Sequence, residues 1–215
     1  MKLNITEMLV GKTSKLRNII RYSNGNRIHN ETVAEHSFFT AYYAMLMAYA
    51  LRAEGLSMID VGEVATYALM HDLDECVTGD FIRTFKHSNP QLVDALMSAS
   101  EGATKHLLRD MFGEPQPFLY TLWKCAKQPE TIHGQIVAFA DFLSVLAYLM
   151  QELQSGNTYI LAQIDGFKEY CDGFSNMPMF QQCSVAKEWL KTAKLHVEKI
   201  LKIRKEAALW KPLEK

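Results

Sequence analysis

The sequence predicts an all-α fold, a single helical bundle formed by residues 1–215. Apolar residues recur at positions i, i+3 and i+4 through nearly every segment, which is the pattern of amphipathic helices. No segment shows the strict alternation of apolar and polar residues that is typical of a half-buried strand. The 215 residues, 48% of them hydrophobic, are enough for one well-packed core, and no repeat, low-complexity tract or linker divides them.

In the first half of the chain, one motif clearly marks where a helix begins. Thr32-x-x-Glu35 has the form of a capping box, in which a hydroxyl and a carboxylate bind free backbone N–H groups at a helix start. A strong turn signal, Ser23-Asn24-Gly25-Asn26, comes before it. The helices expected here cover residues 3–21, with an interruption near Gly11, then 32–52 and 57–74.

In the second half of the chain, proline and glycine mark where helices begin and end. Asn89-Pro90 opens a helix because proline is favoured at the first helical position, and Gly113 closes it. A long apolar helix follows and ends before Gly156. The helices expected here cover residues 90–113, a short segment after Pro117, then 132–154, 159–172 and 184–209.

Composition argues against several partners and compartments. The formal net charge of -1 gives no reason to expect nucleic acid or an anionic membrane. The longest apolar run, Phe38 to Leu51, is shorter than the ~20 residues that span a bilayer. The polar N-terminus is not a signal peptide, and the four cysteines lack paired spacing, as expected for free thiols. We therefore expect a cytoplasmic protein without a nucleic-acid or membrane partner.

Two histidines and two aspartates lie on segments that are otherwise apolar. His36 opens one expected helix, His71 and Asp72 end another, and Asp141 stands inside the apolar stretch 138–143. Buried ionisable groups are unfavourable unless they pair or bind a cation, and one divalent metal would satisfy all four. Mixed imidazole and carboxylate ligands suit Mn, Co, Fe or Zn. Taken singly, His36 could instead be a hydrogen-bonded residue at the core edge, and Asp141 could pair with Arg or Lys.

Helix geometry restricts where such an ion could lie. Neighbouring helical residues such as His71 and Asp72 point about 100° apart. They can reach one ion only if it lies beyond the helix end, between the two side chains. His36 is in the first turn of its own helix, so both helix ends would bring ligands to the edge of the core.

Three motifs carry a resemblance to a known family: Glu31-Thr32-Val33-Ala34-Glu35-His36-Ser37, then Met70-His71-Asp72-Leu73-Asp74-Glu75 followed by Thr78-Gly79-Asp80, and Ala140-Asp141. Over about residues 15–155 the chain resembles the HD-domain superfamily of metal-dependent phosphohydrolases. Within it, the chain is most similar to the bacterial 5'-deoxynucleotidases and the related phage dATP triphosphohydrolases. The resemblance implies a single HD domain, to which the helices over residues 158–210 add.

The resemblance implies catalytic roles at the matching positions. Glu75 would activate or orient the attacking water, and Asp80 would act as a second acid on the substrate side. Arg21 would also be catalytic, because it would neutralise the charge that develops on the phosphate. Taken alone, Glu75 could be a surface acid, and Asp80 could be a residue that only stabilises the turn in which it lies. The implied ligands of a divalent transition metal, Co, Mn or Zn, are His36, His71, Asp72 and Asp141.

Three further matches fall on the substrate side. Arg21 has the spacing of a phosphate-binding arginine, whose planar guanidinium can form two parallel hydrogen bonds to phosphate. Tyr22 matches an aromatic position that packs on the base, and Lys86 matches a lysine suited to phosphate. Taken alone, Arg21 could be a solvated residue at a helix end, and Lys86 an exposed lysine.

The chain departs from the family pattern on this same side. Phe81-Ile82-Arg83-Thr84 stands where the bacterial enzymes have a proline-rich segment, and Tyr22 stands where they have tryptophan. These differences bear on specificity more than on the chemistry.

The resemblance implies an enzyme that hydrolyses the 5'-phosphoester of a deoxynucleotide and releases the deoxynucleoside. Monophosphate and triphosphate substrates, dATP among them, stay open because both reactions attack the same kind of ester. Family likeness also implies a homo-oligomer, a dimer or higher. Two alternatives stay open: a phosphodiesterase for another small phosphoester, and a non-catalytic helical scaffold stabilised by metal.

Overall fold

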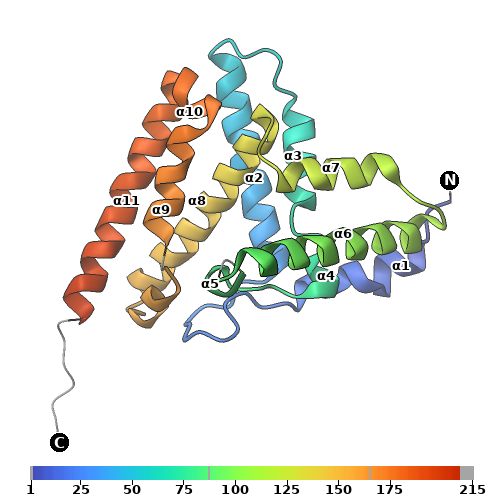
Figure 1. The fold of residues 1–215 in the computed structure, drawn as a ribbon, viewed down its shortest axis with the longest axis horizontal. Helices are drawn as coiled ribbons and strands as arrows, with labels where there is room; N and C mark the ends of the chain where they lie inside the picture. The colour runs from blue at the N-terminus through green and yellow to red at the C-terminus, as the bar shows by residue number, and fades with distance from the viewer. Residues whose placement is uncertain (1, 87, 165, 209–215) are drawn as a thin grey trace, which may run out of the picture.

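The structure, a computed structural model, describes residues 2–86, 88–164 and 166–208 (Figure 1). These residues form no β-strand, which confirms the all-α prediction; Ile20 and Thr32 form an isolated antiparallel bridge. The α-helices are α1 (Ile5–Val10), α2 (Val33–Ala53), α3 (Val61–Met70), α4 (Glu75–Thr78), α5 (Arg83–Lys86), α6 (Pro90–Phe112), α7 (Pro117–Lys127), α8 (Ile132–Gln154), α9 (Phe167–Gly173), α10 (Pro178–Gln182) and α11 (Ser184–Ala208). The 3-10 helices are η1 (Lys12–Arg17), η2 (Tyr159–Ile164) and η3 (Phe174–Asn176).

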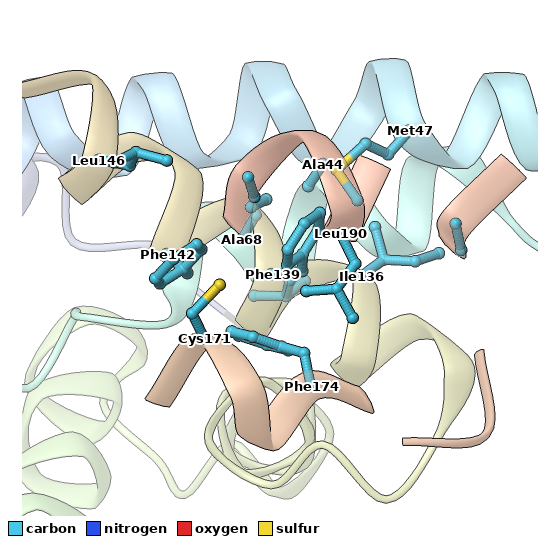
Figure 2. Close-up of a cluster of buried hydrophobic side chains, with 14 of the residues drawn as sticks. Ala44, Met47, Ala68, Ile136, Phe139, Phe142, Leu146, Cys171, Phe174 and Leu190 are labelled. Carbon is cyan, nitrogen blue, oxygen red and sulfur yellow. The ribbon is translucent and has the colours of Figure 1, made fainter. Parts of the chain in front are cut away.

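The core forms where α2, α3 and α8 pack together. Figure 2 shows Ala44 and Met47 of α2 pointing into a cluster that contains Phe139 of α8 and Phe174 of η3. The Phe139 and Phe174 rings meet edge to face with centroids 5.1 Å apart, which is a favourable aromatic arrangement. The C-terminal elements therefore cover one side of α8, and α2 and α3 cover another.

The predicted helix caps are confirmed. The Thr32 hydroxyl accepts a hydrogen bond from the Glu35 backbone N–H at 3.1 Å, and the Glu35 carboxylate accepts from the Thr32 N–H at 2.7 Å. Asn89 caps α6, with Pro90 as its first residue. Gly113 ends α6 in the left-handed conformation at φ 73°, which glycine adopts without steric strain.

The helix predicted over residues 57–74 is shorter at both ends. α3 begins at Val61, because the Asp60 carboxylate caps it by accepting a hydrogen bond from the Glu63 N–H at 2.9 Å. The chain leaves the helix after Met70, and residues 71–74 form a turn that leads into α4.

Two other predicted helices are divided. The predicted helix 3–21 breaks at Gly11 into α1 and η1, as expected, but it ends at Arg17 rather than at residue 21. The predicted helix 159–172 is split into η2 and α9. Gly166, at φ 73°, lies between these two elements. The short helices α4, α5 and α10 were not predicted, because four or five residues do not show a helical period. The predicted end of the last helix, residue 209, lies outside the described residues.

α8 is the described helix that is long and apolar enough, by length and composition alone, to cross a membrane. Just over half of its most apolar stretch is buried inside the protein. Phe139, Ala140 and Phe142 are completely buried there. The apolar residues of α8 thus supply the core, and α8 rather than the run Phe38 to Leu51 is the most apolar long segment.

Candidate metal centre and adjoining cleft

Three separate elements bring the two histidines and two aspartates together. His36 lies in the first turn of α2, directly after the capping box, and is fully buried. His71 and Asp72 follow the last residue of α3, where the chain turns, and Asp141 lies in the middle of α8. The helix end at His71 is what allows two adjacent residues to face one point.

The four side chains converge within ion-pair distances. His36 Nε2 lies 3.0 Å from Asp141 Oδ1 and 3.6 Å from Asp72 Oδ2. His71 Nε2 lies 2.9 Å from Asp72 Oδ2 and 3.3 Å from His36 Nε2. One ligand atom each from His36, His71 and Asp141 lies within 4.8 Å of the others, a grouping that could hold a metal ion. Asp72 joins this group through its contacts with both imidazoles.

The hydrogen bonds of the two imidazoles favour cation binding. His71 Nδ1 lies 2.6 Å from the Ala68 carbonyl, which can only accept, so this nitrogen carries the proton. His36 Nδ1 lies 3.1 Å from the Ser144 hydroxyl. His36 Nε2 lies within 3.6 Å of three further polar atoms, Asp141 Oδ1, His71 Nε2 and Asp72 Oδ2. A single proton on that nitrogen could serve only one of them, whereas a divalent cation among the four atoms would contact all of them, so the donor set fits a metal ion.

The ionisation states of His36 and Asp141 also suit metal binding. Burial, with help from the Arg21 charge, lowers the pKa of His36 to about 4, which keeps its imidazole neutral. Burial works against ionisation of Asp141, but its hydrogen bond with His36 prevails and lowers the pKa of Asp141 to about 2. Metals bind neutral imidazole and ionised carboxylate, and these are the forms that the shifts favour for His36 and Asp141. Burial opposes the charged form of His71, but the Asp72 carboxylate prevails and raises the pKa of His71.

Seven of the predicted site residues line a single cleft of about 140 Å³ next to the metal-centre residues. Phe81, Ile82, Phe142, Leu149 and Phe167 are among its apolar walls. His36 and His71 are buried beside it. The predicted residues in its lining are Arg21, Tyr22, Asp72, Glu75, Asp80, Lys86 and Asp141.

Glu75 reaches the cleft from α4, one turn beyond Asp72. Its Oε2 atom is buried and has no hydrogen-bond partner among the described residues. Burial raises the pKa of Glu75 well above its usual range, and the nearby Asp72 and Asp80 carboxylates raise it further. Glu75 is therefore not a solvated surface acid, and its free oxygen needs a ligand, water or proton.

Arg21 is also buried, so it is not a solvated helix-end residue. Its Nη1 lies 3.2 Å from Glu31 Oε2, while its Nε is buried without a hydrogen-bond partner among the described residues. Tyr22 adopts a positive φ of 54°, and its ring stacks on Tyr148 with centroids 5.2 Å apart. One face of Tyr22 is thus already covered by protein.

Three residues of the site were not predicted from the sequence. Lys127 Nζ of α7 lies 3.1 Å from Asp72 Oδ1 and 3.2 Å from Asp74 Oδ1. Glu31 pairs with Arg21, and Ser144 meets His36. Glu31 belongs to the motif that precedes His36, and Ser144 lies three residues beyond Asp141 on α8, so both had a local signal. Lys127 had none.

The family described as "5'-deoxynucleotidase YfbR-like" matches residues 9–176. The chain belongs to this family. A 5'-deoxynucleotidase of Pasteurella multocida is 27% identical over 147 residues, which cover 66% of this chain and 73% of the relative.

Two solved structures share the fold. A protein of Pyrococcus horikoshii has a TM-score of 0.72 and 20% identity, covering 90% of this chain and 99% of that one. An HD-domain phosphohydrolase of Listeria innocua has a TM-score of 0.59 and 19% identity, covering 88% and 98%. The family match confirms the predicted resemblance and the predicted enzyme class, a hydrolase of the 5'-deoxynucleotidase type, and the two structures confirm the fold.

Proposed function

We propose that this protein is a metal-dependent phosphohydrolase that cleaves the 5'-phosphoester of a deoxynucleotide and releases the deoxynucleoside. One observation carries the proposal: the cleft joins Asp72 and Asp141 of the candidate metal centre to the cations Arg21 and Lys86. A phosphate held by these cations would lie beside the metal-centre carboxylates. Family membership supports the same chemistry.

His36, His71, Asp72 and Asp141 would together hold one divalent ion, and Co, Mn and Zn suit this mixed donor set. When bound, such an ion polarises a phosphoryl oxygen and lowers the pKa of water. Lys127 would keep Asp72 oriented, because its ammonium binds the Oδ1 oxygen and leaves Oδ2 facing the imidazoles.

Glu75 would accept the proton of the attacking water. A general base must come within hydrogen-bond distance of that water, and Glu75 lines the same cleft as Asp72, with a buried Oε2 that has no hydrogen-bond partner among the described residues. The raised pKa of Glu75 makes its carboxylate a stronger base than a solvated one. Asp80, which lines the same cleft, would position the sugar or the water.

Arg21, Lys86 and Tyr22 would hold the nucleotide. Glu31 holds one end of the Arg21 guanidinium and leaves Nε without a partner among the described residues, so a phosphate oxygen can fill that place. The Tyr148 ring supports one face of Tyr22, so the base would stack on the other face.

We propose a cytoplasmic homo-oligomer, a dimer or higher, that acts on free deoxynucleotides rather than on nucleic acid. The net charge of -1 supports the last point, because a nucleic-acid surface would call for an excess of basic residues.

The test is a panel of metals and substrates. The metal-free protein is supplied with Co(II), Mn(II), Zn(II) or Mg(II) and offered all deoxynucleoside mono- and triphosphates, with products separated by chromatography. Release of deoxynucleoside with phosphate identifies a nucleotidase, and release with intact triphosphate identifies a triphosphohydrolase. A preference for ribonucleotides, or for a phosphodiester, contradicts the proposal.

The scaffold alternative is tested with Glu75→Ala. Loss of turnover with metal still bound supports catalysis, since Glu75 is not among the proposed ligands. Absence of turnover in the parent protein with every metal and substrate supports the scaffold instead.

A further inference from the structure

Residues 22–30, called here the tyrosine loop, form a loop that is closed at its neck. The Arg21 N–H donates a hydrogen bond to the Glu31 carbonyl at 2.9 Å, and the isolated antiparallel bridge lies just outside this pair. Arg21 is therefore held at the neck. Tyr22 is the first residue of the loop itself, so the position of its ring depends on how the loop is held.

A buried acid of α8 holds the far end of the tyrosine loop. Glu152, in the last turn of α8, is fully buried. Its Oε2 accepts a hydrogen bond from the Ile28 N–H at 2.8 Å, and its Oε1 accepts one from the His29 N–H at 2.6 Å. The Asn157 amide donates to the same carboxylate and to the Asn26 carbonyl. Burial opposes ionisation of Glu152, but these hydrogen bonds prevail and lower its pKa, so the loop is anchored on a carboxylate.

Tyr148, one turn before Glu152 on the same face of α8, holds the near end of the loop. Its ring stacks on the Tyr22 ring with centroids 5.2 Å apart and planes 2° from parallel. Its hydroxyl donates to the His29 carbonyl at 2.9 Å. Two residues four positions apart on α8 thus hold the side chain at the start of the loop and the backbone at its end.

The backbone of Tyr22 is strained and needs this support. Its φ of 54° lies in the left-handed region, which bulky residues rarely adopt. The Tyr22 carbonyl accepts hydrogen bonds from the Gly25 N–H at 2.9 Å and from Arg27 Nη1 at 3.2 Å. A strained conformation persists only where its surroundings hold it. Because both donors belong to the loop, loss of the loop anchor would let Tyr22 relax.

The helix that anchors the loop also carries Asp141 of the candidate metal centre. Asp141 precedes Tyr148 by seven residues, which is two turns and about 10 Å along the helix axis. α8 therefore sets the distance between a metal-centre carboxylate and the support of the Tyr22 ring.

We propose that Glu152 is a positioning residue for the substrate: it holds the backbone of the tyrosine loop and thereby keeps the Tyr22 ring where a nucleobase stacks on it. This inference rests on the proposed function, because it takes Tyr22 as the residue that packs on the base. Tyr22 lines the cleft, and Glu152 is not among the described residues that do. Glu152 acts through Tyr22 rather than by touching the substrate.

Glu152→Gln tests the proposal, because it keeps the shape of the side chain but replaces one oxygen with an NH2 group, which cannot accept from a backbone N–H. The metal-loaded protein is assayed with the deoxynucleotide that the parent cleaves fastest. We expect KM to rise about 10-fold or more, because fewer molecules have the loop in its binding conformation. We expect kcat to change less than about 3-fold, since the metal centre and Glu75 are untouched.

Two controls accompany this variant. The inhibition constant of inorganic phosphate, which has no base to stack on Tyr22, should be the same in Glu152→Gln and in the parent. Gln151→Ala, at the neighbouring exposed position of α8, should keep the KM of the parent. A phosphate constant that weakens as much as KM would mean that Glu152 supports the whole cleft, and it would overturn the assigned role.

A double variant separates positioning from a general structural role. If Glu152 acts through Tyr22, adding Glu152→Gln to Tyr22→Ala should raise KM no further. Additive effects, or a KM of Glu152→Gln equal to that of the parent, overturn the proposal. Circular dichroism confirms that each variant is folded. Should Glu152→Gln not fold, Asn157→Ala takes its place, because it removes one donor to Glu152 and the hydrogen bond to the Asn26 carbonyl.

Failure of the proposed function would give a different result. If the metal-loaded parent cleaves no deoxynucleotide, calorimetry compares how the parent and Glu152→Gln bind the four deoxynucleoside monophosphates. Binding that is about 10-fold weaker in Glu152→Gln supports the positioning role although the reaction is wrong. Equal binding by both proteins, or no binding by the parent, overturns the positioning role as well.

Discussion

Replacing Lys127 with methionine tests how the metal-centre carboxylates are held. The Lys127 ammonium lies 3.1 Å from Asp72 and 3.2 Å from Asp74, and its side chain is 15% exposed. Burial opposes its charge, but the Asp72 and Asp74 carboxylates prevail and raise the pKa of Lys127. Lys127→Met therefore leaves two carboxylates without their cation in a nearly buried place.

The size of the effect follows from these distances. Two unit charges 3.1 Å apart attract by about 5 kcal/mol at an effective dielectric constant near 20, before desolvation is subtracted. Removing one partner of a buried pair typically lowers stability by 3–5 kcal/mol. Trp123 Nε1 still donates to Asp74 at 3.0 Å, so we expect the lower end, about 3 kcal/mol.

The assay is urea unfolding of the metal-free protein, followed by circular dichroism. Lys124→Met, three residues earlier on α7, is the control: Lys124 is half-buried but lies outside the ion pairs with Asp72 and Asp74, so this variant should lose less than about 1 kcal/mol. Added divalent metal should restore part of the loss in Lys127→Met, because the ion neutralises Asp72. A metal-free Lys127→Met protein as stable as the parent would refute the assigned role.

Three other perturbations have expected outcomes. Glu75→Gln should lower kcat by about 10²–10⁴ while the metal stays bound, measured by steady-state kinetics and metal analysis; unchanged kcat would contradict its role as base. Ser144→Ala should weaken metal binding about 10-fold or more, measured by calorimetry, because the His36 ring loses its hydrogen-bond partner; equal affinity would count against it. Burial raises the pKa of Glu31 to about 7, although the Arg21 charge opposes this shift. The protonated form of Glu31 therefore favours the folded state: its contribution to stability is complete below about pH 4.5 and is lost as the pH rises through 7. Glu31→Gln should therefore remove up to about 3 kcal/mol of the pH dependence of unfolding between pH 5 and 8, and parallel curves for both proteins would contradict this.

Much of the fold could be predicted because its signals are local. Thr32 and Glu35 indicate the start of α2, and Asn89-Pro90 indicates the start of α6; each signal lies within a few residues of sequence. The start of α3 was missed because Asp60 was not recognised as its cap. The 3-10 segments and four-residue helices depend on tertiary packing, which no short window contains.

The residues of the candidate site likewise divide into those that a local sequence motif predicts and those that only the tertiary packing brings in. Seven of the nine predicted residues line one cleft, and His36 and His71 lie beside it. The motifs that carry His36, His71 and Asp72 lie at helix starts and ends, where side chains can face a common point. Lys127 could not be predicted, since its partners Asp72 and Asp74 lie more than fifty residues earlier and only the packing of α7 on α3 brings them together. The support of Tyr22 by Tyr148 likewise joins two distant segments.

Anomalous diffraction from crystals grown with Co(II), Mn(II) or Zn(II) tests the central claim most directly. We predict one strong peak per chain, at about 2.0–2.2 Å from the Nε2 atoms of His36 and His71 and from carboxylate oxygens of Asp72 and Asp141. A peak elsewhere with these four side chains still paired to one another, or no peak at saturating metal, would contradict the claim that they form one metal centre.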